Sequence, residues 1–127
     1  LLASQTNDER ASAAEINLAG RRRMLSQRIG LLASQLQLNP RPADIADLEH
    51  SAREMAEIHR LLLDGTPDRR IRPLPDSLRS AFDAPDGPHA KIAHFLNLAN
   101  SLQTLPTDSE AFRTTLEEVV SLGRAMC

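Results

Sequence analysis

The sequence predicts an all-helical fold, an antiparallel four-helix bundle with a long first helix. The chain of 127 residues contains no Trp or Tyr and three Phe residues, so its core must be mainly aliphatic, which suits helix-on-helix packing. The shortage of aromatic and β-branched residues argues against an all-β fold. Four long stretches with helical spacing of apolar residues are separated by proline and glycine. A chain of this length holds one core, so residues 1–127 are expected to form a single domain.

The first helix is expected to run from about Ala3 to Leu38, because no proline occurs before Pro40. About 35 helical residues would span roughly 50 Å, which is long for a small domain and typical of a receptor domain that reaches a membrane. One stripe of this helix follows the spacing of a helix packed in a bundle, and a second, heptad-spaced stripe lies beside it. The first stripe consists of Leu18, Arg22, Leu25, Ile29, Leu32 and Leu36, and the second of Met24, Leu31 and Leu38.

A turn at residues 39–42 leads into the second helix, which is expected to end near Asp64 with Gly65 as its stop. Residues 65–88 contain five of the eight prolines and are therefore the main irregular connection. A short helix capped by Asp76 is expected within this connection. The inward residues predicted for these two helices are Ile45, Leu48, Ala52, Met55, His59 and Leu62, then Leu78 and Phe82.

A third helix is expected to follow Pro88 and to be broken by Pro106. The pattern Thr107-x-x-Glu110 is typical of a capping box and predicts the start of the fourth helix. The inward residues predicted for these helices are Ile92, Phe95, Ala99 and Leu102, then Phe112, Leu116, Val119 and Met126.

Composition excludes several classes of function. The net charge of −2 argues against a general nucleic-acid binder. Cys127 is the single cysteine, so one chain can form neither a disulfide nor a zinc site of thiolates. No two histidines have the spacing of a helix-borne metal site, and no nucleophile–base pair stands out, so neither an enzyme nor a cofactor is expected.

The chain begins at Leu1 and has no apolar run long enough to span a membrane. We therefore expect it to be a fragment of a larger, membrane-anchored receptor whose spans lie outside this sequence.

The segment of residues 16–30 does not have the pattern of an ordinary bundle helix. It places Gly20 and Gly30 inside a helix, where each costs about 1 kcal/mol relative to Ala. It also places four arginines within eight residues, with no acid among them. At about 100° per residue, a small polar face falls within roughly 80° of arc. This face consists of Gly20, Arg23, Gln27, Gly30 and Ser34.

Small residues on a helix face let another backbone approach closely, and a second copy of the chain is the natural partner. Two Arg23 side chains would then meet near a two-fold axis, where an anion between them would relieve their repulsion. A guanidinium binds a flat oxyanion such as nitrate through two hydrogen bonds.

The pattern leaves other interpretations open. The four arginines could form a solvated basic face, or a patch for nucleic acid or a membrane surface. Arg28 lies about 140° around the helix from Arg23. It could brace the site, pair with an acid on a neighbouring helix, or face solvent.

Residues 16–29, INLAGRRRMLSQRI, closely resemble the signature INLAGRQRMLSQRI of PilJ-type sensor domains, and Arg22 in place of Gln is the one departure. The run of residues 59–65 and the later Pro73-Leu74-Pro75 also look like this family. A related stretch occurs in nitrate/nitrite sensor kinases of the NarX and NarQ type.

The resemblance implies the periplasmic sensor domain of an inner-membrane signalling receptor, either a chemoreceptor or a histidine kinase. It implies a homodimer that forms through the first helix and binds nitrate or nitrite, with Arg23 contributed by both subunits. The ligand-binding residues expected on this basis are Arg23, Gly20, Arg28, Ala19 and Gln27. The alternative function is a protein-interaction module of a PilJ-like receptor that has no small-molecule ligand.

Overall fold

A computed structural model describes residues 12–84 and 87–126 of the chain. Within these ranges it contains five helices and no strand, so the prediction of an all-helical fold is confirmed. The helices are α2 (Ala13–Leu38), α3 (Pro42–Asp64), α4 (Asp76–Phe82), α5 (Pro88–Leu102) and α6 (Glu110–Ala125).

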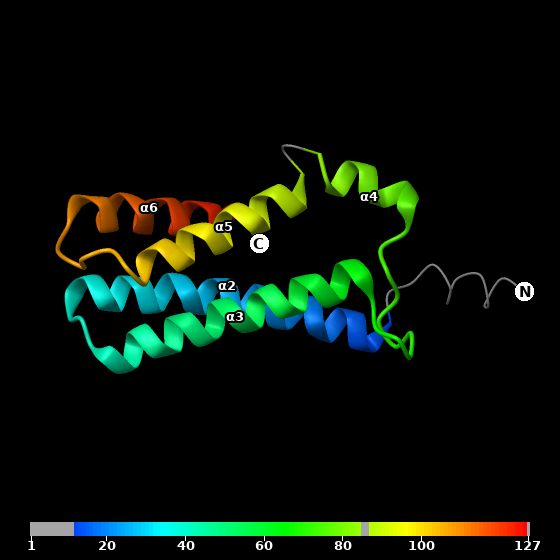
Figure 1. Cartoon of the computed structure of the whole chain (residues 1–127), viewed down its shortest axis with the longest axis horizontal. Coiled ribbons are helices and arrows are strands. Elements are labelled where there is room, and N and C mark those ends of the chain that lie inside the picture. The colour runs from blue at the N-terminus through cyan, green and yellow to red at the C-terminus, as the bar shows by residue number, and fades with distance from the viewer. Residues whose placement is uncertain (1–11, 85–86, 127) are drawn as a thin grey trace, which may run out of the picture.

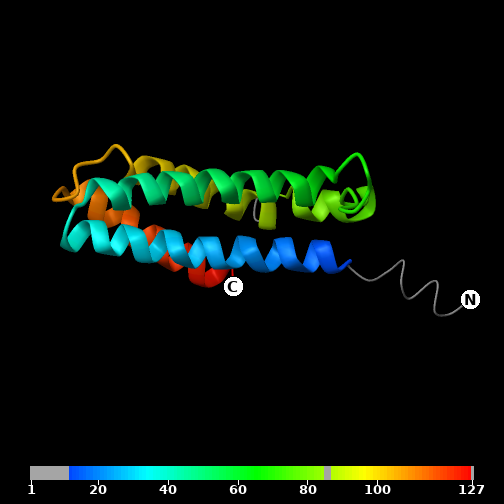
Figure 2. The ribbon, with the colours of Figure 1, turned by 90° about the horizontal axis from the view of Figure 1, so that it is seen from below.

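The four long helices enclose a common core. Helix α2 packs against both α3 and α6, and α5 packs against the same two helices. Successive long helices run in opposite directions, and α6 lies beside the C-terminal half of α2 and ends near its middle (Figures 1 and 2). The side chains that α2 contributes to the centre of this core include Leu25, Ile29, Leu32, Ala33 and Leu36.

Helix α2 begins later than the sequence predicted. Ser12 is extended, with φ −66° and ψ 162°, and its hydroxyl accepts a hydrogen bond from the backbone N–H of Glu15. The Glu15 carboxylate accepts in return from the backbone N–H of Ser12, which completes a capping box. The expected helix from Ala3 is therefore not continuous through Ser12, and its earlier part lies outside the described residues. The 26 residues of α2 span about 39 Å.

The end of α3 is as predicted. Helix α3 ends at Asp64, and Gly65 follows with φ 75°, a conformation that favours glycine. A Cβ at Gly65 would lie 2.6 Å from the backbone nitrogen of Pro73, so the turn leaves no space for a side chain.

Two predicted caps are wrong. The carbonyl of Pro75 accepts from the N–H of Arg79, so Asp76 is the first helical residue of α4 instead of its cap. Helix α6 is capped by Ser109, whose hydroxyl accepts from the N–H of Phe112, whereas Thr107 lies in the preceding turn. The residues that precede the first helical turn are therefore Pro75 for α4 and Ser109 for α6, neither of which the sequence pattern indicated.

Most of the predicted inward residues of α3, α5 and α6 are buried. Ile45, Leu62 and Met126 are partly buried and pack against the edge of the core. Leu78 of α4 is 57% exposed, and the side chain of Phe82 lies outside the described part of the structure. The heptad stripe of Met24, Leu31 and Leu38 is exposed and does not join the core.

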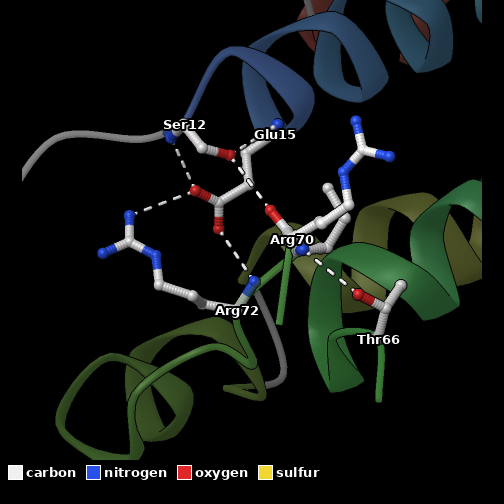
Figure 3. A network of polar contacts seen from close by, with 6 residues as sticks. Ser12, Glu15, Thr66, Arg70 and Arg72 are labelled. Carbon is white, nitrogen blue, oxygen red and sulfur yellow. Dashed lines mark hydrogen bonds and ion pairs between the residues drawn. The ribbon is translucent and has the colours of Figure 1, made fainter. Parts of the chain in front are cut away.

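Glu15 connects the start of α2 to the loop between α3 and α4 (Figure 3). Its carboxylate accepts from the backbone N–H of Arg72 at 3.2 Å and from the Arg72 guanidinium at 3.1 Å. The Ser12 hydroxyl donates to the carbonyl of Arg70, and the Thr66 hydroxyl accepts from the N–H of Ile71. Burial raises the pKa of Glu15, but the hydrogen bonds from Ser12 and Arg72 outweigh it and lower this pKa to about 2.

We expect Glu15→Gln to lower the free energy of unfolding at pH 7 by about 1–3 kcal/mol, because the amide cannot replace the charge-assisted hydrogen bonds. Urea unfolding followed by circular dichroism measures this change. The control is Glu57→Gln, which removes an exposed ion pair with Arg60 and is expected to cause no measurable change. Equal effects of the two substitutions would contradict the anchoring role of Glu15.

Candidate anion-binding site

The four arginines of α2 point in different directions around the helix and have different partners. Arg21 forms a two-pronged ion pair with Glu54 of α3, at 2.7 Å from Nε and 3.0 Å from Nη2. This hydrogen bond from Arg21 lowers the pKa of Glu54. Arg28 lies 3.8 Å from Asp47, also on α3. Two of the four charges are therefore balanced by acids of the neighbouring helix.

Arg22 points between the helices and is partly buried. Its Nη1 lies 3.5 Å from His59 Nδ1, and it forms no ion pair with an acid of the described chain. Burial lowers the pKa of Arg22, and the charge of Arg23 lowers it further.

His59 continues this polar contact to α5. Its Nε2 lies 2.9 Å from His89 Nδ1, and the two rings stack at 5.1 Å with 13° between their planes. Because a guanidinium only donates, His59 Nδ1 accepts and the ring carries its proton on Nε2, which donates to His89. Burial lowers the pKa of His59, as do the charge of Arg22 and the electrostatic interaction with the His89 ring, and its value is about 4. His59 is therefore neutral at pH 7 and links Arg22 of α2 to His89 of α5.

Arg23 is exposed and has no acidic partner in residues 12–84 or 87–126. Together with Ala19, Arg22 and Ser26 it lines a cavity of about 220 Å³. Lys91 at the start of α5 adds a third cation to this lining, and the remaining lining residues are Met55, Pro88, Ile92, Ala125 and Met126. Among the described residues, this cavity, hereafter the Arg22 cavity, has three cations and no acid in its lining.

The small polar face predicted on α2 is open to solvent in the single chain. A Cβ built on Gly20 or Gly30 would have no described atom within 4 Å apart from its chain neighbours and the nearby backbone of α2 itself. Gln27, Gly30 and Ser34 line a shallow groove between α2 and α6. The face is therefore available to a partner outside the chain.

The five predicted ligand-binding residues do not all gather in one place. Ala19 and Arg23 share the Arg22 cavity, whereas Gln27 lies in the neighbouring groove and Gly20 is exposed. Arg28 lies on the α3 side and pairs with Asp47, one of the three alternatives that the sequence left open.

Lys91, His59 and His89 were not singled out as site residues from the sequence. His59 had been placed on the inward face of its helix, but no short-range pattern connects it to His89, which lies 30 residues further along. Lys91 stands in the first turn of α5 after Gly87-Pro88, a position that predicts a helix start and says nothing about its neighbours.

Comparison with known proteins identifies one family. Residues 4–85, more than half of the chain, match the family model PilJ, described as type IV pili methyl-accepting chemotaxis transducer N-term. No curated protein and no solved structure matches the chain. None of the helices in the described ranges is long and apolar enough to cross a membrane.

The low pKa of His59 predicts how stability depends on pH. Because this pKa falls from 6.5 to about 4 on folding, the stabilisation is complete above pH 6.5 and is lost as the pH falls towards 4. After allowance for solvent screening, we expect a loss of about 1–2 kcal/mol across this window. In His59→Gln the amide keeps one acceptor and one donor but does not titrate. The loss of unfolding free energy between pH 6.5 and pH 4 that comes from His59 should therefore disappear. Urea unfolding from pH 4 to pH 7 tests this, with the exposed His50→Gln as control; an unchanged slope in His59→Gln would contradict it.

Proposed function

Since this chain belongs to the PilJ family of chemotaxis transducer N-terminal domains, we propose that it is the periplasmic sensor domain of an inner-membrane receptor. The four long helices form an antiparallel bundle, and two copies associate through α2. A small anion, nitrate or nitrite, binds between the two copies, as in the sensor kinases of the NarX and NarQ type that the signature resembles.

The outward face of α2 is the observation that supports this proposal. Of the five large hydrophobic side chains that are strongly exposed in the described part of the chain, four lie on α2: Ile16, Met24, Leu31 and Leu38. At about 100° per residue they fall within roughly 80° of arc, opposite the buried stripe, and this arc overlaps the one that holds Gly20, Gln27, Gly30 and Ser34. Apolar side chains around small residues are typical of a close helix–helix contact.

Arg23 stands at the edge of this outward face. A symmetric contact between two α2 helices would bring two Arg23 guanidinium groups towards each other. Neither has an acid to balance it within its own described chain. A planar anion that accepts hydrogen bonds from both would relieve this repulsion.

The proposed signal depends on the difference between the anion-free and the anion-bound dimer. Without an anion, repulsion between the arginines favours a relative arrangement of the α2 helices that separates them. With an anion, the arrangement that closes on it is favoured, and only this differential affinity shifts the equilibrium. The movement of α2 against α6 would then pass to the membrane spans of the receptor.

Arg23→Ala should abolish nitrate binding, whereas wild type should bind about one anion per two chains. Isothermal titration calorimetry with nitrate and nitrite at constant ionic strength gives both affinity and stoichiometry, with chloride as the anion that tests selectivity. The control is Arg69→Ala, which removes an exposed arginine of the loop between α3 and α4. Unchanged nitrate affinity in Arg23→Ala would exclude the shared site.

Gly30→Ala separates packing within the chain from packing between chains. Because the added Cβ meets no atom within 4 Å, the substitution should stabilise the isolated chain by about 0.5–1 kcal/mol. In a close α2–α2 contact the same methyl group would hold the helices apart and weaken the dimer. Sedimentation equilibrium and urea unfolding measure the two effects. Gly123→Ala on α6, where the Cβ would make an ordinary 3.5 Å contact with Phe95, is the matched control; equal dimer affinity in both variants would contradict an interface at Gly30.

A further inference from the structure

The Arg22 cavity lies within one chain, between α2, α3, the start of α5 and the end of α6. Its lining residues, apart from Arg23, differ from those of the outward face of α2, so we treat the cavity as a separate feature.

The charge in this cavity is unbalanced. Arg22, Arg23 and Lys91 line it, and no acidic side chain of the described residues does. Pro88, at the N-terminus of α5, also lines the cavity, and the partial positive charge of a helix N-terminus has the same sign as these three cations. The cavity therefore attracts anions.

Arg22 is the most buried of the three cations. It is partly buried, its Nη1 contacts the neutral His59 at 3.5 Å, and it pairs with no described acid. Both causes that lower its pKa, burial and the charge of Arg23, would be offset by an anion at the cavity. A guanidinium in this situation is suited to hold a carboxylate through two parallel hydrogen bonds.

The size and the remaining lining of the cavity indicate what kind of anion fits. A volume of about 220 Å³ corresponds to roughly seven water molecules at about 30 Å³ each. An inorganic anion such as nitrate would fill only a fraction of it. The rest of the lining is largely apolar and includes Met55, Ile92 and Met126, of which Met126 is the most exposed. Such a lining favours a ligand with an apolar part beside its charged group.

We propose that the Arg22 cavity binds a small aliphatic carboxylate, one per chain. Arg22 and Lys91 hold the carboxylate group, and the aliphatic tail lies against Met55, Ile92 and Met126. The site is additional to the nitrate site between subunits and does not require it.

The three methionines of the chain provide a direct test. Met55 and Met126 line the cavity, whereas Met24 faces the opposite groove between α2 and α3. In a sample labelled with ¹³C at the methionine methyl groups, titration with sodium butyrate should shift the signals of Met55 and Met126 saturably and leave that of Met24 in place. Butyramide, which has a similar shape and no charge, should cause no saturable shift.

Arg22→Gln should raise the dissociation constant for butyrate at least about tenfold, because it removes the charged fork. Lys91→Gln, at an exposed position where folding is not at risk, should weaken binding in the same direction. Arg69→Gln removes one exposed positive charge that does not line the cavity and should leave binding unchanged. Nitrate binding between subunits should survive Arg22→Gln, so the two sites fail independently. Equal shifts with butyramide, absence of shifts at Met55 and Met126, or unchanged affinity in both Arg22→Gln and Lys91→Gln would overturn the proposal.

Discussion

The rotation of α2 about its own axis is the constraint on which the other features of this domain depend. That rotation is set by burial of Leu25, Ile29, Leu32 and Leu36, all at most 6% exposed, against α3 and α6. Burying each of these side chains stabilises the fold by about 1.5–3 kcal/mol, so turning α2 by one residue would be costly. Once this stripe faces inward, the direction of every other side chain on α2 is determined.

The same rotation places the four neighbouring arginines of α2 in different surroundings. Arg21 and Arg28 fall on the side of α3 and meet Glu54 and Asp47 there. Arg22 falls next to the buried stripe and turns towards His59 and the cavity, while Arg23 lies at the edge of the outward face. Exposed ion pairs such as Arg21–Glu54 and Arg28–Asp47 contribute little to stability. Arg22 and Arg23, which pair with no acid of the described residues, are the two arginines to which we assign ligands.

The sequence was sufficient for features that depend on local periodicity and was insufficient for those that depend on contacts between distant segments. The all-helical class, the end of α3 at Gly65 and the inward residues of α5 follow from spacing and punctuation alone. The start of α2 could also have been found, because Ser12-x-x-Glu15 is a capping-box pattern. By contrast, the caps of α4 and α6 depend on which of several adjacent residues starts the hydrogen-bond ladder. The contact of His59 with His89 and the place of Lys91 depend on how α5 packs against α2 and α3, which no short pattern encodes.

Arg23 connects the two ligand sites that we propose, and this has a thermodynamic consequence. The Arg23 guanidinium has one unit of charge. An anion in the Arg22 cavity would partly neutralise this charge, which would then attract an anion between the subunits less strongly. If both sites are used, each anion lowers the affinity of the other, and the effect is reciprocal by linkage. Gln, the usual residue of the family signature at position 22, would reduce the charge of the cavity and leave Arg23 to the interface. The single departure of this chain from that signature therefore falls at the partly buried cation of the cavity that we propose to bind a carboxylate.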